Sequence, residues 1–130
     1  MNTASTLDSI KKHIADSPLH YIKGQCRLLN LTPEEWIEWN NEDDFFDPQM
    51  PHHRIISFAL GNILVGELVI EKEHISSCKI DDANNFDMVL DIRANGLMTI
   101  MHIHCSNDFP GLLEFAEFVA YDEPDPNLNK

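Results

Sequence analysis

The feature that most constrains the fold is the Asn95-Gly96 pair, which separates two stretches of alternating apolar residues. Asn-Gly is a preferred pair for a two-residue type I′ turn, because both positions require a positive φ. The turn fixes a hairpin register in which Ala94 lies opposite Leu97 and Met88 lies opposite Ile103. The face that contains these pairs is almost wholly apolar and is predicted to belong to the core. The opposite face carries the polar residues Asp87, Asp91, Arg93, His102 and His104, together with Met98, Val89 and Ile100. A shift of one residue would exchange the two faces, so the pattern itself supports this register.

A second hairpin is predicted at residues 54–71, where Gly61-Asn62 separates two more apolar stretches. In a two-residue-turn register, one face would carry Ile55, Ala59, Leu64, Leu68 and Ile70, and the other Ile56, Phe58, Leu60, Ile63 and Val65. Because both faces are apolar, we expect this hairpin to be central and covered on both faces, or covered on one face by a partner. Residues 75–80 are expected to add a short strand before a polar loop at residues 81–85.

Three helices are predicted before these strands. Ser5 or Thr6 can cap a first helix, whose apolar side would be formed by Leu7, Ile10 and Ile14. Pro18 is well placed to open a second helix, whose stripe would be Leu19, Ile22, Cys26 and Leu29. The capping box at residues 32–35 begins a third helix, which ends near Asn40-Asn41 and carries Trp36, Ile37 and Trp39. A loop from Glu42 to His53 follows.

The chain is expected to close with one further helix, from about Pro110 to Tyr121, capped by Asn107 or Asp108. Its apolar side would consist of Leu112, Phe115, Ala116 and Val119, and residues 122–130 would form a flexible polar tail. The predicted fold class is therefore α+β: two or three N-terminal helices, a mainly antiparallel sheet of four or five strands, and a C-terminal helix packed on the sheet. A chain of 130 residues fits a single domain.

The cysteines and the first residues favour a cytoplasmic protein. Cys26, Cys78 and Cys105 are odd in number and widely spaced, which is typical of free thiols in a reducing compartment. The residues after Met1 are polar and predict no signal peptide. The longest apolar run, residues 63–70, is too short to cross a membrane.

Charge is the most informative bulk property. Twenty-two acidic residues against nine Lys and Arg give a formal net charge of −13. Neither Lys nor Arg occurs between Leu28 and His53 or between Ala94 and Asn129. Such a field repels nucleic acid and anionic membranes and attracts a basic partner or cations, although solubility alone is an equally good explanation.

The sequence contains no recognisable catalytic motif, and we expect neither an enzyme nor a cofactor. Cys105 is adjacent to His104, but neighbouring strand residues point to opposite faces, so Cys105 is interpreted as a packing residue. The candidate metal ligands are His102 and His104, which share a strand face with Asp87 across the hairpin. Two imidazoles and a carboxylate are suitable ligands for zinc or iron, although Asp87 and His104 would pair equally well as an ordinary cross-strand contact.

An acidic and aromatic segment is the favoured partner-binding site. Exposed aromatic rings among acids are typical of interfaces, where the rings provide contact area and the charges steer a basic partner. We expect some rings of the segment to pack inward, with Trp39 or Phe45 remaining outside. The predicted binding residues are Glu34, Glu35, Glu38, Trp39, Glu42, Asp43, Asp44, Phe45 and Asp47.

In size, acidity and lack of a catalytic signature, the chain resembles the small immunity proteins that neutralise bacterial nuclease toxins. The resemblance implies a non-enzymatic inhibitor whose carboxylates mimic substrate phosphates while aromatic rings fill the cleft of the toxin. Two alternatives stay open. One is a small metal-dependent enzyme or metal sensor that uses His102, His104 and Asp87, and the other is an adaptor or homo-oligomeric subunit that pairs through the hairpin at residues 54–71.

Overall fold

A computed structural model describes residues 3–27, 33–41, 53–83, 85–94, 96–105 and 116–124. The described strands form one antiparallel sheet with the order β3-β2-β1-β7-β6-β5-β4. The strands are β1 Ile22–Arg27, β2 His53–Leu60, β3 Ile63–Glu71, β4 Ile75–Ile80, β5 Phe86–Ala94, β6 Leu97–Cys105 and β7 Ala116–Pro124. The helices are α1 Thr3–Asp16, α2 Pro33–Asn41 and the 3-10 turn η1 Lys72–His74. None of the described helices is long and apolar enough to span a membrane.

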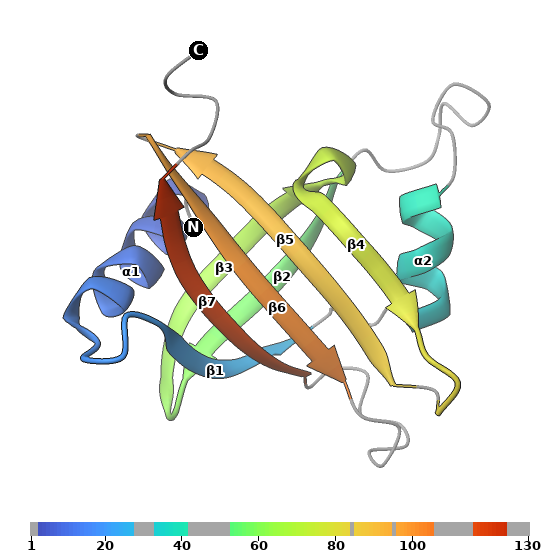
Figure 1. The fold of residues 1–130 in the computed structure, drawn as a ribbon, viewed down its shortest axis with the longest axis horizontal. Coiled ribbons are helices and arrows are strands. Elements are labelled where there is room, and N and C mark those ends of the chain that lie inside the picture. Colours follow the sequence, from blue (N-terminus) through green and yellow to red (C-terminus); the bar gives the residue numbers. More distant parts are fainter. Residues whose placement is uncertain are drawn as a thin grey trace.

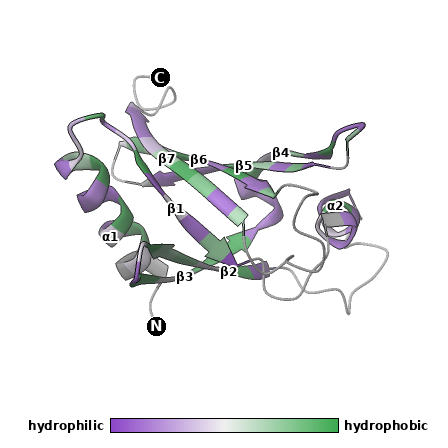
Figure 2. Cartoon of the chain, turned by 90° about the horizontal axis from the view of Figure 1, so that it is seen from below, coloured by the Kyte–Doolittle hydropathy of each residue, from purple (hydrophilic) through white to green (hydrophobic). Residues whose placement is uncertain are grey.

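The sheet curls into a half-barrel. Viewed edge-on, β4 to β7 lie above β2 and β3, and β1 runs obliquely between the two groups (Figure 2). Helices α1 and α2 lie at opposite sides of the curl (Figure 1). Helix α1 contacts β3 and β7, whereas α2 contacts β4. Each helix therefore closes one open side of the curled sheet.

The core lies on the concave face, where strand residues alternate between buried and exposed. Strands β5, β6 and β7 contribute the buried residues Phe86, Met88, Leu90, Ile92, Met101, Ile103, Cys105, Ala116, Phe118 and Ala120. The rings of Phe58 on β2 and Phe118 on β7 meet edge to face, with centroids 5.0 Å apart. This contact spans β1, which separates the two strands in the sheet. Leu7, Ile10 and Ile14 of α1 are buried in the same core, as expected from their spacing.

The hairpin between β5 and β6 is confirmed, with its register. Ala94 pairs with Leu97 and Met88 with Ile103, and Gly96 has φ +81°. The strand at residues 75–80, the polar loop after it and the helix that begins at Pro33 are also confirmed. The capping residue Thr32 and the turn residue Asn95 lie outside the described residues.

The predicted fold class is wrong, because two expected helices are strands and the sheet has seven strands rather than four or five. The segment after Pro18 forms β1, with Cys26 buried between the exposed Gln25 and Arg27. Ile22 and Cys26 are four residues apart, and this spacing fits one helical turn as well as two strand repeats. The residues between Ile22 and Cys26 distinguish the two possibilities: Lys23 and Gln25 are both exposed, which is the alternation of a strand.

The expected C-terminal helix is replaced by β7 in the part that the structure describes. Ala116, Phe118 and Ala120 are buried at every second position, whereas the helical stripe combined Ala116 with Val119. Residues 106–115, including the proposed caps Asn107 and Asp108, lie outside the described residues. The polar tail is also shorter than expected, because residues 122–124 belong to β7.

Two further expectations need correction. The hairpin at residues 53–71 is not central, since β3 forms an edge of the sheet. A register shift next to Phe58 pairs this residue with Gly66, so that Leu68 and Ile70 join Ile56 and Phe58 on the buried face. Helix α1 begins at Thr3, and the proposed cap Thr6 is a buried residue inside the helix.

Candidate functional site

Helix α2 is fixed to the body of the protein by two tryptophans. Pro33 occupies the first helical position, and Glu34 and Glu35 lie in the first turn, where carboxylates interact favourably with the helix dipole. Trp36 and Trp39 are three residues apart and therefore share one helical face. Their side chains are 0% and 1% exposed, and their rings meet edge to face with centroids 5.7 Å apart.

Two cations stack on Trp39 from other elements. The guanidinium carbon of Arg54 on β2 lies 5.6 Å from the ring centroid, and Nζ of Lys72 in η1 lies 5.7 Å from it. Cation–π contacts of this kind stabilise a site by about 0.5–2 kcal/mol. Of the two rings expected to stay outside, Trp39 is therefore buried, and its ring links α2 to the hairpin of β2 and β3. Phe45 lies outside the described residues.

The outer face of α2 is acidic. Glu34, Glu35 and Glu38 are all exposed, and the described part of this segment contains no Lys or Arg. The other predicted binding residues, Glu42, Asp43, Asp44, Phe45 and Asp47, lie outside the described residues. The structure therefore brings three of the nine predicted residues together on one exposed face and removes Trp39 from it.

The convex face of the β5–β6 hairpin carries the residues considered for metal binding. Nδ1 of His104 lies 2.9 Å from Oδ1 of Asp87, its cross-strand neighbour. Nε2 of His102 lies 3.3 Å from the hydroxyl of Tyr121 on β7, and the two rings stack with centroids 5.8 Å apart. Each imidazole therefore has its own neighbour, on opposite sides of β6.

This arrangement does not favour the metal site. Side chains two residues apart on a strand point the same way but start about 6.6 Å apart. Among the described residues, His102, His104 and Asp87 are not among the groups whose donor atoms lie within 4.8 Å of one another. The observed contact between His104 and Asp87 is an ordinary cross-strand pair.

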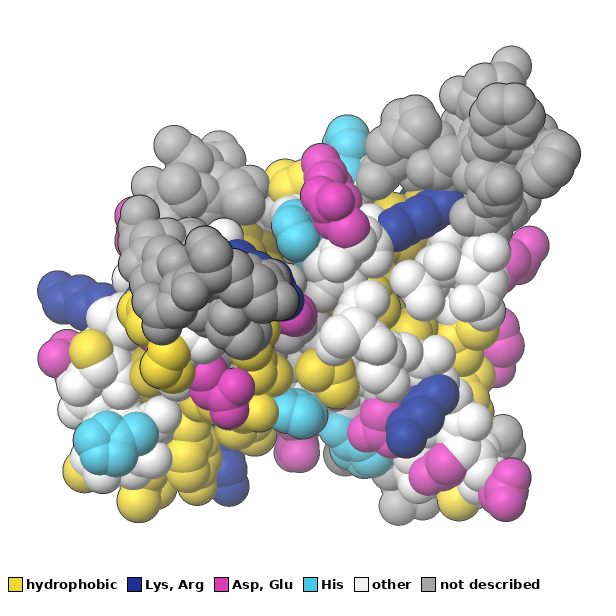
Figure 3. Space-filling view, turned by 45° about the horizontal axis from the view of Figure 1, so that its top comes forward, with side chains coloured by type: hydrophobic (Ala, Val, Ile, Leu, Met, Phe, Trp, Pro, Cys, Tyr) yellow, Lys and Arg dark blue, Asp and Glu magenta, His cyan; other side chains and the backbone are white. Residues whose placement is uncertain are grey.

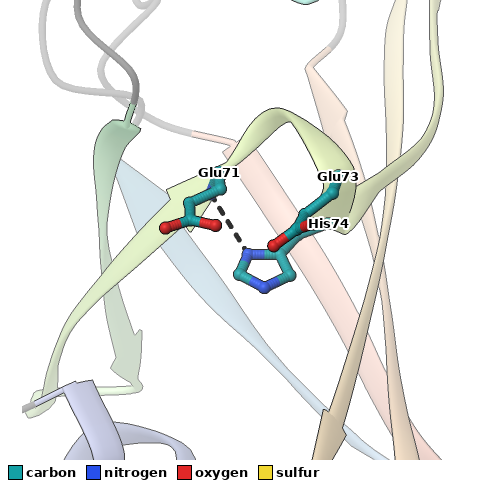
Figure 4. Close-up of side chains that lie close together, drawn as sticks. All are labelled: Glu71, Glu73 and His74. Atoms are coloured by element: carbon teal, nitrogen blue, oxygen red, sulfur yellow. Dashed lines mark hydrogen bonds between the residues drawn. The ribbon is translucent and has the colours of Figure 1, made fainter.

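One compact group of metal-ligand types was not predicted. Donor atoms of Glu71, Glu73 and His74 lie within 4.8 Å of one another where β3 runs into η1. Figure 4 shows both carboxylates near the imidazole edge that carries Nδ1. This Nδ1 accepts the backbone N–H of Glu71 over 3.1 Å, which caps η1. Two acids and a histidine within four residues are a sequence signal that could have identified this group. However, Nδ1 of His74, the nitrogen near both carboxylates, is already occupied by the backbone N–H of Glu71.

The three free cysteines have the properties of packing residues. Burial raises the pKa of the Cys26 thiol far above its ordinary value, and the nearby Cys105 raises it further. Burial also raises the pKa of Cys105, and it raises that of Cys78 to about 11. A reactive cysteine needs the opposite shift, because the thiolate is the nucleophile. Cys105 is 5% exposed, which confirms the prediction that it packs inward.

Acidic side chains are distributed over the surface rather than confined to α2. Figure 3 shows carboxylates scattered across one whole face, with Lys and Arg between them. Beyond β4, the pKa of Asp81 lies below its usual value, chiefly because its carboxylate accepts the backbone N–H of Asn85. The backbone N–H of Ala83 and the nearby His104 act in the same direction. The acidic face of α2 is thus one part of a widely negative surface, distinguished by its rigid support.

No known protein family, curated protein or solved structure matches this chain, so its functional interpretation depends on its own residues.

Proposed function

We propose that this chain is a non-enzymatic binding protein that inhibits or sequesters a basic macromolecular partner, in the manner of an immunity protein that neutralises a nuclease toxin. The observation that carries the proposal is the exposed acidic face of α2, formed by Glu34, Glu35 and Glu38. This face stands on a helix whose opposite side is anchored by two almost fully buried tryptophans.

Rigid support matters because ordering a surface during binding reduces affinity. Fixing the backbone of a flexible segment costs about 1–2 kcal/mol per residue, in addition to the cost of immobilising side chains, and a preformed helix avoids this backbone cost. The contacts of Trp39 with Arg54 and Lys72 hold α2 against the sheet before any partner arrives. Carboxylates at fixed spacing can then replace the phosphates that a nuclease binds.

The net charge of −13 supports the same function through association kinetics. Opposite charges accelerate diffusional encounter, and such pairs can reach a Kd on the order of nanomolar or tighter. The acceleration decreases as salt screens the charges. The proposed complex should therefore form fast at low salt and more slowly at high salt, with smaller changes in its dissociation rate.

The test uses a basic nuclease domain encoded beside the gene of this chain, with polylysine as a generic polycation. In the first variant, Glu34, Glu35 and Glu38 are changed to Lys. A matched control variant makes the same change at three exposed acids on other elements, Asp8, Glu67 and Glu123, and has the same net charge. Nuclease inhibition and association rates are measured for both variants and for the wild type.

We expect the α2 variant to bind the nuclease at least 100-fold more weakly, because three complementary contacts become repulsive. The control should lose only a few-fold in association rate, and both variants should bind polylysine equally weakly. Equal losses in the two variants would show a non-specific charge effect and would overturn the proposal. So would a wild-type protein that fails to inhibit the nuclease.

A further inference from the structure

We propose that a second copy of this chain docks on an apolar corner beside the Gly61-Asn62 turn, in a twofold dimer that brings the two β3 edges together. The apolar corner consists of Leu19, Ile22, Leu60, Ile63 and Leu64. It lies at the lower left of Figure 1, whereas α2 lies at the right. This inference is independent of the proposed function, which concerns α2.

The corner exposes large hydrophobic side chains on both sides of one strand end. Leu19, Ile63 and Leu64 are 65%, 62% and 64% exposed, which makes them the most exposed large hydrophobic residues in the described part of the chain. Ile63 and Leu64 are adjacent on β3 and therefore point to opposite faces. An approaching chain would thus find apolar contact on either side of the strand edge.

Two hollows give the corner its shape. A groove of about 530 Å³ is lined by Leu19, Ile22 and Leu60, together with His13, Asp16, Ser17, Tyr21 and Lys23. A smaller hollow of about 80 Å³ is lined by Leu64 and by Ala59, Phe58 and residues of β1. Leu60 pairs with Ile63 and Ala59 with Leu64 across the turn, so the two hollows are joined by one hairpin end.

The two edges of the sheet differ in protection. At the β4 edge, the strand has six residues, an irregularity between Ile75 and Ser77, and an exposed Lys79, and α2 packs beside it. The β3 edge has nine residues without Lys or Pro. Helix α1 packs on β3 as α2 packs on β4, and both edge strands have an irregularity, so the edges differ in length and in Lys79 rather than in cover. Lysine, bulges and covering elements are the usual means of protecting an edge strand from pairing. The shift next to Phe58 interrupts β3, so pairing is expected only at its end beside the turn.

Charge selects a second copy as the occupant. Two chains of −13 repel each other, so they can associate only where the local charge is small. At the corner, Lys23 and Asp16 line the same groove. Arg27 lines the smaller hollow. In the sheet, Arg27 pairs with Ser57, and Ser57 pairs with Glu67 on its other side. Acids and bases both line this corner, whereas a basic partner would favour the face of α2, whose exposed charged residues are all acidic.

The strand is also compatible with its own symmetry mate. An antiparallel pairing centred on Leu64 places this residue opposite its equivalent in the second copy and Ile63 opposite Val65, and Glu67 lies beyond the paired end. The two Glu67 side chains then avoid the direct cross-strand position at which like charges destabilise a sheet. An isologous contact of this kind closes at two copies and produces no fibre.

The dimer should be weak. Three side chains exposed by about two thirds present roughly 300–400 Å² of apolar surface, about half the area that each partner buries in a standard interface. We therefore expect a dissociation constant between about 10 and 1,000 μM. Added salt should strengthen the dimer because it screens the repulsion between the copies.

The test is sedimentation velocity from about 5 μM to about 2 mM, a range that spans the expected dissociation constant, at low and high salt, with the wild type and two variants. Ile63→Lys changes the first strand residue after the Gly61-Asn62 turn. Leu97→Lys is the matched control, because Leu97 is the first strand residue after the other hairpin turn and is also exposed, at 37%. We expect dimers in the wild type and in Leu97→Lys, and at least a tenfold weaker association in Ile63→Lys.

A second measurement protects the test against misfolding of a variant. Backbone amide shifts of the wild type are followed during dilution, and the changes should concentrate around Ile63 and Leu64. A wild type that stays monomeric at the highest concentration would overturn the proposal. Equal dimerisation of Ile63→Lys, or dilution shifts centred on β4 or α2, would do the same.

Discussion

Gly24, in the middle of β1, is the position at which a single methyl group should most disturb this fold. A Cβ atom there would lie 2.6 Å from Cε1 of Phe118 and 2.8 Å from Cδ2 of Leu60, and it would also collide with the carbonyl oxygen of Ala59. The backbone of Gly24 does not have a positive φ, so the objection to a side chain is space alone. Strand β1 joins the two layers of the curled sheet, and Gly24 lets β2 and β7 approach it closely.

The cost of Gly24→Ala follows from which of these neighbours can move. The Leu60 side chain can change rotamer, but the Ala59 carbonyl belongs to the strand that pairs with β1. Insertion of a methyl group into a packed core costs about 1–3 kcal/mol, and a backbone neighbour puts this case at the upper end. We expect a loss of about 3 kcal/mol in the free energy of unfolding, and a decrease in Tm of about 10 °C.

The assay is urea unfolding followed by circular dichroism, with Gly61→Ala as the control. Gly61 has φ +59° and nothing within 4 Å of a Cβ atom, so its substitution carries only the left-handed backbone cost of about 1–2 kcal/mol. In a second comparison, Phe118→Leu is made in the wild type and in Gly24→Ala. The loss of stability from Phe118→Leu should be smaller in Gly24→Ala, because the smaller Leu side chain leaves room for the methyl group at position 24. A loss from Gly24→Ala that is no larger than the loss from Gly61→Ala would refute the reasoning.

Three other predictions follow from buried or hydrogen-bonded groups. Trp39→Ala should lower the free energy of unfolding by about 3–5 kcal/mol in urea unfolding, and unchanged stability would contradict the burial of Trp39. Asp81 has a folded-state pKa below its ordinary 3.8, so its contribution to stability is present above that pH and is lost as pH falls through the folded value. Asp81→Asn should flatten this part of the acid unfolding curve. Burial raises the pKa of Cys78 from 9.0 to about 11, so this thiol contributes stability below pH 9 that is lost as pH rises toward 11. Iodoacetamide should therefore modify Cys78 slowly at about pH 8, and Cys26 only after unfolding, as measured by mass spectrometry.

The hairpin of β5 and β6 could be predicted from the sequence because its information is local. A turn pair that requires positive φ fixes the register, and strict alternation fixes the buried face. Strand β1 lacks such information. Its isolated propensity is ambiguous, and it becomes a strand because β2 and β7 offer hydrogen-bonding edges on both sides. Those partners lie far away in the sequence, so no local pattern could reveal them.

The hairpin of β2 and β3 shows a different limit. Its strands and turn were predicted correctly, but one register shift next to Phe58 moved Leu68 and Ile70 to the other face. A bulge changes face assignment for every residue beyond it, and Gly66, with φ +142°, is the only local sign of one in this described hairpin. The apparent double-sided apolar pattern therefore became one buried face and one partly exposed face at the sheet edge.

The exposure of the candidate binding residues could be predicted for the acids but not for the aromatic ring. Charge can be assigned to the outside from the sequence, because burying an unpaired carboxylate is costly, and Glu34, Glu35 and Glu38 are indeed exposed. The position of an aromatic ring cannot be assigned in this way. Trp39 is enclosed by cations from residues 54 and 72, a neighbourhood that exists only after the sheet has formed.

The two proposed surfaces lie at opposite sides of the molecule, and this separation makes them experimentally independent. A twofold dimer through the apolar corner would leave both α2 helices facing away from the symmetry axis (Figure 1). Reversal of the α2 charges should then abolish partner binding without weakening the dimer. Ile63→Lys should weaken the dimer and leave the affinity of each chain for the nuclease unchanged to within a few-fold. If the α2 variant weakened the dimer, although its lower net charge reduces repulsion, or if Ile63→Lys weakened nuclease binding by more than the few-fold expected from charge alone, the two surfaces would have to be coupled through the core. The rigid attachment of α2 by its tryptophans would then no longer explain its role.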